Sequence, residues 1–498
     1  MSKEKKRLEN NKEIVDSYIE QKMYTFAETL EANDGLVFLQ YMMEEGLSED
    51  FSNAPFTGKR ASISNVEVFP MIYLLNILVG EWSNRRTKRI LTNEALMKIM
   101  GFDEEEIKNG ITKRGKSNQY GEEYERTAGV MASTTVIDNI ARFTHEGLTE
   151  CFNKYIRRTS EAGIVDLGGE FVLDSTIVET APGYPGAEMT RRPKDEEREE
   201  YDTIWGFKVF VLSSAKTKTP VAAEITTANV SDLTMLLKMV KKGVENLGEG
   251  KIKIVLADRG FIDGNQLYEL KYKMGIDFVL PAKKTMNIWS DMVGLRKENS
   301  NNIERWKYGK KGSSGGYLCK GSVSYSQYSA EDVGHQKDKN GEPLNAVVVT
   351  IWRDKEISPG NEKVLLTSLD TDSAIKVIGL YGHRSLIENC NFRELKQAAA
   401  LNQLPQLRNN NTKKTAYNHM LLCVLTLALF TILVTITYSN PELAKKKIAK
   451  NIREFQFMQR CEKGKIFVLC YNYFHIYDMD EFMFLAGFIR LPEKEPIY

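Results

Sequence analysis

Hydrophobic and polar positions change their spacing near Gly168, and this change separates regions of different predicted structure. Before Gly168, apolar side chains recur with mainly helical spacing, for example over residues 66–99 and 130–158. Basic loops interrupt this part of the chain, so residues 1–160 are predicted to be a helical region with basic loops. Such loops are typical of a DNA-binding module, and equally of a solvated charged face, so both interpretations stay open.

Beyond Gly168, short apolar runs alternate with helical patterns. Two runs, over residues 170–174 and 253–257, have the length and composition of central strands, and a carboxylate stands at the end of each. Residues 206–213 and 220–227 are two more predicted strands, joined by a polar turn. Strands that alternate with helices after an initial hairpin predict an α/β unit with a mixed sheet over residues 165–282.

The alternation of strand and helix patterns stops over residues 283–370, where glycine clusters separate further strand-like runs. We interpret this segment as a β-rich insertion carried on the α/β unit. Helical spacing returns at Ser373, so residues 371–440 are predicted to complete that unit. The last segment, residues 441–498, alternates aromatic and charged groups and is predicted to be a basic and aromatic region without an assigned fold.

One stretch challenges a purely globular interpretation. Met420–Thr437 contains 18 residues without a charge, which is the short end of the range for a membrane-spanning helix. A helix in the centre of a large domain is also hydrophobic on all sides, because other parts of the protein surround it. We favour the buried helix, and a membrane-associated protein is kept as an alternative.

Composition narrows the classes of protein. The 498 residues, of which 42% are apolar, suffice for two to four globular domains. The chain has 68 basic and 67 acidic residues, a net charge of +1 that excludes a histone-like polycation. Basic residues are nevertheless concentrated locally, with nine Lys or Arg against three acids in residues 281–325. Six cysteines without a CxxC pair, and a charged N-terminus, argue against a secreted scaffold and predict a cytoplasmic location.

Two acids in the α/β unit are candidates for chemistry. Asp174 and Asp258 follow apolar strands, and in open α/β sheets functional sites gather at the carboxyl ends of strands. Two carboxylates side by side need a cation or a shared proton, because an unpaired buried charge is costly. The structural alternative is that each aspartate caps the helix or turn that follows it.

A third acid lies on a predicted helix. Tyr381, Arg384 and Glu388 are spaced i, i+3 and i+7, so they project from one helix face. That face offers a carboxylate to a metal ion, and a guanidinium and a phenol to phosphate. An ordinary Arg–Glu surface pair is the alternative.

These motifs together resemble those of a family. Asp174 in LDST, Asp258 in ADRGF and Glu388 in Tyr-x2-Arg-x3-Glu are similar to the motifs of the DDE transposases of bacterial insertion sequences. The branch concerned carries a Tyr-Arg-Glu-Lys signature. The resemblance covers residues 165–405 and includes the stretch Thr226–Asp232 between the first two acids.

The signature lysine departs from the family pattern. It is expected at the position of Leu395, whereas Lys396 comes one residue later. Either the helix contains a bulge between Glu388 and Lys396, or Lys396 acts from a shifted face.

The resemblance implies a ribonuclease-H-like mixed sheet with flanking helices, interrupted by the β-rich insertion and preceded by the helical region. It implies two Mg²⁺ or Mn²⁺ ions, with Asp174 bridging both ions while Asp258 and Glu388 each hold one. The residues implied to bind DNA phosphates are Tyr381, Arg384 and Lys396.

The function implied is that of a DNA transposase. It would cut phosphodiester bonds at the terminal inverted repeats of its element and join them to target DNA, both double-stranded, with residues 1–160 binding the DNA ends. A homodimer in a synaptic complex, no membrane partner, and a nucleoid-associated place in a bacterial cytoplasm are expected. The alternative is a catalytically silent DNA-binding relative.

Overall fold

The structure is a computed structural model, and every structural statement below concerns the residues it describes. These are 29–31, 35–57, 65–78, 88–93, 96–97, 100–111, 129–163, 165–194, 200–298, 303–308, 314–325, 327–330, 342–353, 356–369, 374–387, 391–397, 399–405, 412–437, 457–462, 465–470 and 473–478. The chain divides into two compact units, each treated separately here. The first comprises Met1–Tyr155, Ala398–Leu429 and Leu433–Tyr498, and the second comprises Ile156–Gln397 and Phe430–Ile432.

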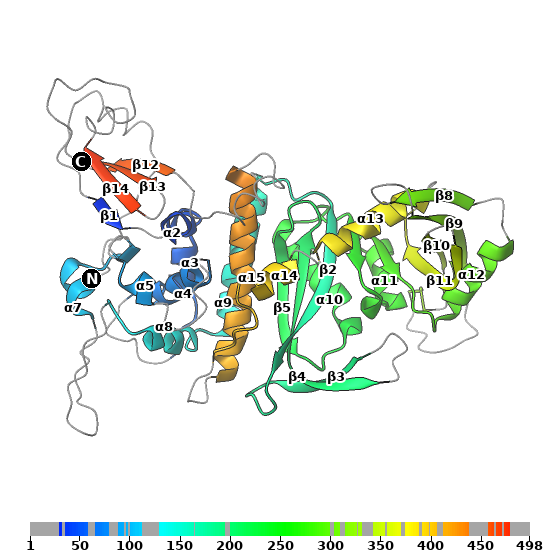
Figure 1. The fold of residues 1–498 in the computed structure, drawn as a ribbon, viewed down its shortest axis with the longest axis horizontal. Helices are drawn as coiled ribbons and strands as arrows, with labels where there is room; N and C mark the ends of the chain where they lie inside the picture. Colours follow the sequence, from blue (N-terminus) through cyan, green and yellow to red (C-terminus); the bar gives the residue numbers. More distant parts are fainter. Residues whose placement is uncertain are drawn as a thin grey trace, which may run out of the picture. The chain divides into compact units, whose positions relative to one another are not determined.

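Helices dominate the first unit (Figure 1). They are α2 (Gly35–Glu44), α3 (Leu47–Asn53), α4 (Val68–Leu78), α5 (Lys88–Leu91), α7 (Glu104–Asn109), α8 (Ser133–Ile140), α9 (His145–Ala162, which continues into the second unit) and α15 (Thr412–Thr437). Local sequence explains where α7 begins, because Asp103 and Glu106 form a reciprocal capping box. Helices α4, α8 and α9 lie where helical spacing was predicted.

Four short strands make a separate antiparallel sheet in this unit. They are β1 (Thr29–Glu31), β12 (Phe457–Glu462), β13 (Lys465–Cys470) and β14 (Tyr473–Asp478), in the order β1-β14-β13-β12. Three of these strands fall in the final segment, for which the sequence predicted no fold. The sheet pairs the beginning of the chain with its end, a long-range pairing that local patterns do not reveal.

Helix α15 contains the uncharged stretch. By length and composition it could cross a membrane, but most of its apolar window is buried inside the protein. Fully buried Asn418 donates from Nδ2 to the carbonyl oxygens of Ile140 and Phe143, at 2.9 and 3.1 Å. These bonds satisfy carbonyls at the end of α8, and they require α15 to lie against it. Within this unit, α15 therefore packs as an interior helix.

His419 on α15 is held neutral. Its Nε2 lies 3.0 Å from the carbonyl oxygen of Ala400, so Nε2 donates and Nδ1 accepts from the Tyr73 hydroxyl at 2.9 Å. Burial lowers the pKa of His419 to about 4, against its usual value near 6.5.

This pKa makes stability depend on pH. The unfolded chain binds a proton at His419 as the pH falls through about 6.5, whereas the folded chain resists protonation down to about 4. Stability is therefore lost between these values, by up to about 3 kcal/mol. Urea unfolding of wild type and His419→Gln across this range is the measurement, and the non-titrating variant should show the shallower pH dependence. Parallel curves would contradict the assignment.

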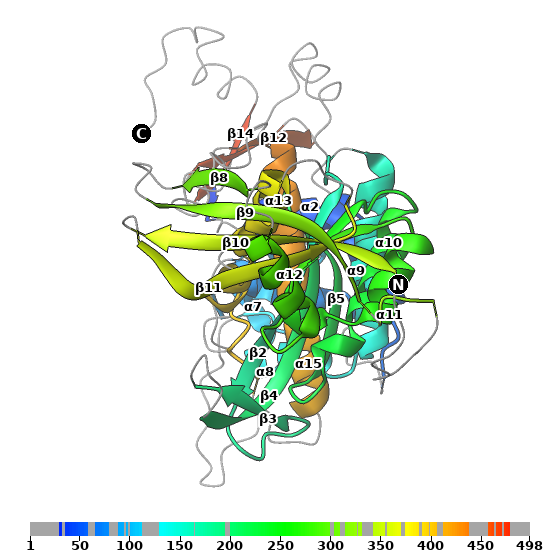
Figure 2. The same cartoon turned by 90° about the vertical axis from the view of Figure 1, so that its right-hand side faces the viewer.

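The second unit is built on one sheet of ten strands, in the order β3-β4-β2-β6-β7-β11-β10-β9-β8, with β5 also paired to β4 (Figures 1 and 2). The strands are β2 (Glu170–Thr180), β3 (Glu188–Pro193), β4 (Tyr201–Ser214), β5 (Pro220–Thr227), β6 (Ile254–Ala257), β7 (Asp277–Pro281), β8 (Ile303–Tyr308), β9 (Ser314–Ser324), β10 (Pro343–Arg353) and β11 (Glu356–Thr367). The helices are η1 (Asp232–Thr234), α10 (Leu236–Leu247), η2 (Arg259–Phe261), α11 (Gly264–Tyr272), α12 (Asn287–Glu298), α13 (Ala374–Ile387) and α14 (Arg393–Gln397).

The strand order confirms the predicted fold class. β2 pairs antiparallel with β4, which pairs antiparallel with β5, while β2, β6 and β7 run parallel. The core order β5-β4-β2-β6-β7, three antiparallel strands followed by two parallel ones, is that of a ribonuclease-H-like sheet. The predicted strands at 206–213, 220–227 and 253–257 correspond to β4, β5 and β6.

One strand boundary was predicted wrongly. We expected the first core strand to end at Asp174, but β2 continues to Thr180 because β4 keeps pairing with it as far as Trp205. The parallel partner β6 does stop at Ala257, opposite Leu173. Asp174 therefore lies where the parallel pairing ends, although its own strand goes on.

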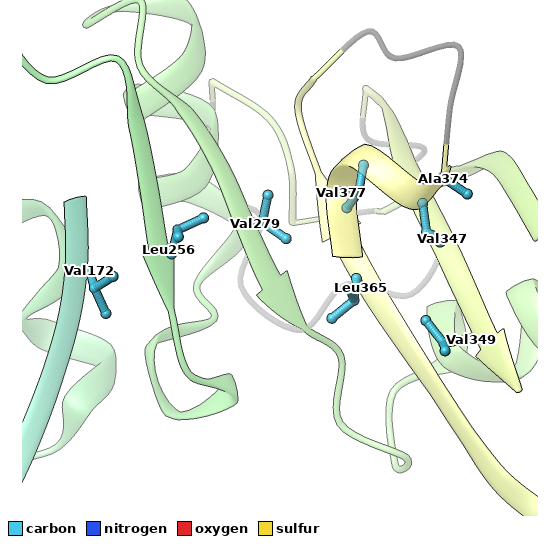
Figure 3. Packing of buried hydrophobic residues seen from close by; sticks show 8 residues of the cluster. All are labelled: Val172, Leu256, Val279, Val347, Val349, Leu365, Ala374 and Val377. Atoms are coloured by element: carbon cyan, nitrogen blue, oxygen red, sulfur yellow. The ribbon is translucent and has the colours of Figure 1, made fainter. Parts of the chain in front are cut away.

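Helices cover both faces of the sheet. Side chains alternate between faces along a strand, so Val172 faces one layer and Leu173 the other. On the first face α13 packs across the core strands, and Figure 3 shows the apolar cluster that joins them. Its members are Val172, Leu256, Val279, Val347, Val349, Leu365, Ala374 and Val377. On the opposite face α10 packs against β4 and β5.

The strands between the two parts of the core extend the same sheet. β11 pairs antiparallel with β7, and β10, β9 and β8 follow in a row (Figure 2). Helix α12 packs against β9, β10 and β11. Cluster members from β10 and β11 pack with Ala374 and Val377 of α13. The strands of residues 283–370 thus help to support the helix that carries the site residues.

Candidate active site

Two aspartates meet at the end of the parallel pairing. Leu173 of β2 is in register with Ala257 of β6, so the next residue of each chain segment, Asp174 and Asp258, leaves the same edge. The side chain of Asp174 is 10% exposed, whereas that of Asp258 is 39% exposed. The pair therefore has one buried member and one accessible from solvent.

Capping does not explain either acid. Asp258 precedes the short helix η2, but its side chain makes no capping hydrogen bond. Asp174 Oδ1 accepts from the backbone N–H of Ser175 at 2.8 Å, within a strand that simply continues. The structure therefore does not support capping of a helix or turn as the role of Asp174 and Asp258.

Arg384 lies across both carboxylates. Its Nη2 is 3.8 Å from Asp174 Oδ2 and 3.7 Å from Asp258 Oδ1. Its Nη1 donates to the hydroxyl of Tyr381 at 3.4 Å, and its guanidinium lies 5.9 Å from the centre of that ring. The structure thus brings together four of the six predicted site residues, through α13 packed on β2 and β6.

Tyr381 is a neutral hydrogen-bonding group in this site. Burial raises the pKa of its hydroxyl, and the negative charges of Asp258 and Asp174 raise it further, while Arg384 lowers it. The hydroxyl therefore keeps its proton near neutral pH and can donate to an anionic oxygen.

Glu388 lies outside the described residues, because α13 is described only to Ile387. The predicted third carboxylate is consequently not placed. Among the residues that the structure describes, no three His, Cys, Asp or Glu side chains are grouped closely enough to hold a metal ion.

Lys396 follows a local irregularity of the helix. Asn391 and Phe392 are π-helical, and α14 begins directly after them. A π-turn accommodates one extra residue, so residues beyond it are displaced by one position around the axis. Leu395 is fully buried, whereas Lys396 is half-buried and can reach solvent. Of the two explanations for the late lysine, these observations favour a bulge over a shifted helix face.

The irregularity is anchored by a buried side chain. Asn391 Nδ2 donates to Ser213 Oγ and to the carbonyl oxygen of Lys218, both at 2.9 Å. Burial lowers the pKa of Lys396, the positive charge of Arg192 lowers it further, and Glu179 raises it. Lys396 thus lies near the Glu179 end of β2 and is not grouped with the two aspartates.

A second layer of polar residues supports the aspartates from the other side of β2. Lys208 Nζ lies 2.8 Å from Asp232 Oδ1, and Ser175 Oγ donates to the same oxygen at 3.2 Å. The sequence indicated Asp232 as a residue at the start of a helix, and it was not among the predicted site residues. Nothing in the sequence indicated Lys208 or Ser175, because their contacts cross between strands.

The donor chemistry of the pair fits a hard divalent cation. Carboxylate oxygens are the ligands that Mg²⁺ and Mn²⁺ prefer. Asp174 and Asp258 both approach the Arg384 guanidinium, so this position already favours positive charge. Because the side chain of Asp258 is partly exposed, a cation can reach the two carboxylates from solvent.

Arg384 should be required for cleavage of a DNA substrate. Removing it in Arg384→Ala leaves two neighbouring carboxylates without their cation, and we expect a roughly 10- to 100-fold loss of cleavage rate, the value of one charge-assisted hydrogen bond. Arg384→Lys should recover only part, because an ammonium cannot span both acids. Exposed Arg393, which donates to Gln397, is the matched control. Equal losses in Arg384→Ala and Arg393→Ala would argue against a specific role.

The fold and this site define a class: a ribonuclease-H-like protein with an acidic site at the edge of its central strands. The model of the family described as "Transposase DDE domain" matches residues 168–427. The chain belongs to this family of transposases, which are DNA-cutting and joining enzymes that generally depend on divalent metal ions.

A solved structure is similar at the level of the chain trace. It is a piggyBac transposase in a synaptic complex with hairpin DNA, with 9% sequence identity, a TM-score of 0.43, and coverage of 86% of this chain and 83% of that one. The comparison with curated proteins gives no match.

Proposed function

We propose that this protein is the transposase of a bacterial insertion sequence, of the branch with the Tyr-Arg-Glu-Lys signature. It cuts phosphodiester bonds at the terminal inverted repeats of its element and joins the freed ends to target DNA. The observation that supports this most strongly is the convergence of Asp174 and Asp258 on Arg384 at the carboxyl edge of β2 and β6.

Metal ions are the proposed cofactors. Asp174, Asp258 and Glu388 would hold two Mg²⁺ or Mn²⁺ ions. When bound, such ions activate the attacking oxygen and stabilise the leaving oxygen of an in-line phosphodiester displacement. The buried position of Asp174 fits a shared ligand, and the exposed position of Asp258 fits a ligand of one ion.

The chain's own basic and phenolic groups orient the DNA strand. Arg384 offers planar N–H donors, which suit a phosphate, and its contacts with both carboxylates keep those donors beside the acids. The protonated Tyr381 hydroxyl is a second donor at the same place. Lys396 binds a phosphate farther along the strand, towards Glu179, and thereby serves as the signature lysine.

The partners follow from this reaction. Both DNA ends must be held together, so the acting species is a homodimer on double-stranded DNA, and residues 1–160 bind the ends. The interior packing of α15 within its unit supports a protein without a membrane partner. Because the proposed substrate is bacterial DNA, the proposed location is the nucleoid in the cytoplasm.

The test is a cleavage assay with the full chain. Its substrate is a DNA fragment that carries the coding region together with its natural flanks. With Mg²⁺ we expect nicks at two fixed boundaries and, with added plasmid, joined products; a chelator should abolish both. DNA binding that falls with salt, without any metal-dependent nicking, would instead identify the catalytically silent relative.

A further inference from the structure

Asp232 stands at the start of the short helix η1, directly behind the two aspartates. Ser231 caps this helix, accepting from the N–H of Leu233 at 3.3 Å. Gln266 of α11 fixes the same turn from outside: its Nε2 donates to the carbonyl oxygen of Leu233 at 2.5 Å, and its Oε1 accepts from the N–H of Leu237 at 2.9 Å. The backbone that carries Asp232 is therefore held in place by its neighbours.

The first carboxylate oxygen of Asp232 connects two strands of the core. Ser175, the residue after Asp174 on β2, donates to Oδ1 at 3.2 Å. Lys208 of β4 approaches the same oxygen at 2.8 Å, and its side chain is only 12% exposed. Lys208 also donates to the carbonyl oxygen of Val230 at 3.3 Å, which ties it to the chain just before Asp232.

The second oxygen lies against the segment that follows Asp258. A Cβ atom added to Gly260 would be 2.8 Å from Asp232 Oδ2 and 3.3 Å from its Cβ. No side chain fits at that distance without displacing the carboxylate. Gly260 is the second residue after Asp258, so Asp232 limits how far the Asp258 segment can move towards it.

Asp232 does not belong to the metal-binding group itself. It is among the described residues, and no three potential ligands there are grouped around one point. Its Oδ1 is already engaged by an ammonium and a hydroxyl, and its Oδ2 faces Gly260. Ser175 and Gly260 are its contacts with the two segments that carry Asp174 and Asp258.

We propose that Asp232 is a positioning residue: it sets the separation of Asp174 and Asp258 by holding Ser175 on one side and abutting Gly260 on the other. Lys208 neutralises its charge and keeps it from adding repulsion to the two carboxylates. This inference rests on the proposed function, because it assumes that Asp174 and Asp258 share divalent ions. Residues that orient metal ligands typically change metal affinity or activity 10- to 100-fold when they are replaced.

The test measures Mn²⁺ binding to the full chain, from the paramagnetic resonance signal of the free ion, without any DNA. We expect Asp232→Ala to weaken Mn²⁺ binding about ten-fold or more. Asp232→Asn keeps the shape and the acceptor for Ser175, so it should give an intermediate affinity. The matched control is Asp166→Ala: Asp166 is an exposed acid that pairs with Lys216 near the start of β2, and its loss should leave Mn²⁺ affinity unchanged.

A double-mutant cycle tests the contact with Gly260. Gly260→Ala and Asp232→Ala disturb the same contact, so the double variant should bind Mn²⁺ no more weakly than the worse single variant. Additive losses would overturn the proposed contact. Mn²⁺ affinity in Asp232→Ala and Asp232→Asn within two-fold of wild type would overturn the positioning role.

The same titration distinguishes failure of the proposed function. Wild type should bind Mn²⁺ more tightly than Asp174→Asn. If these two bind Mn²⁺ alike, the metal site is wrong and the inference falls with it. If they differ while Asp232→Ala matches wild type, the metal site stands and only the role of Asp232 is overturned.

Discussion

Replacing Asp174 with asparagine is expected to abolish metal-dependent DNA cleavage, with a loss of at least about a thousand-fold in rate. The amide has the size of the carboxylate but carries no negative charge for divalent ions. Asp258→Asn should have the same effect, because both acids converge on one position. Single-turnover cleavage of an end-labelled DNA fragment is the measurement.

The variant should remain folded and bind DNA. Asparagine still accepts the Ser175 N–H bond at Oδ1, so the thermal midpoint should stay near that of wild type. The control is Asp166→Asn, an exposed acid that pairs with Lys216 away from the site. Cleavage at wild-type rate in Asp174→Asn would remove this residue from the chemistry, and with it the proposed reaction.

The largest loss of stability is expected from Gly206→Ala. Gly206 lies on β4 between Glu179 of β2 and Glu188 of β3. A Cβ atom there would be 2.2 Å from the carbonyl oxygen of Val178, a backbone atom of a paired strand that has no room to retreat. We expect the free energy of unfolding to fall by about 3 kcal/mol, at the upper end of overpacking in a core. Urea unfolding gives the measurement.

A helical glycine provides the comparison. Gly379 of α13 has open space around its Cα, so Gly379→Ala should leave stability unchanged or raise it by up to about 1 kcal/mol. Equal urea midpoints for Gly206→Ala and wild type would mean that β2 and β4 separate more easily than their pairing indicates.

Local patterns were sufficient for the elements that carry the acids. Apolar runs located the strands before Asp174 and Asp258, and an i, i+3 spacing put Tyr381 and Arg384 on one helix face. These predictions rest on periodicity, which depends on nearby residues alone. The same reasoning misplaced the end of β2, because Ser175 to Thr180 form a strand only through pairing with β4.

The position of Lys396 shows a different limit. The sequence revealed that Lys396 is one residue late, and offered two explanations. The π-helical pair at Asn391 and Phe392 favours one of them, and the buried amide of Asn391 holds this pair against Ser213 on β4. A helix pattern contains no information about a hydrogen bond to a strand 178 residues away in the sequence.

The order of residue types along this chain was thus enough to establish a mixed α/β core and to name four residues that the structure brings together at one edge of its sheet. Tertiary packing decided that Arg384 spans the two aspartates, that Asp232 and Lys208 stand behind them, and that the uncharged helix α15 lies in an interior. The physical reason is range: periodicity reports which side of an element is buried, whereas charge pairing and close contacts depend on which distant elements meet.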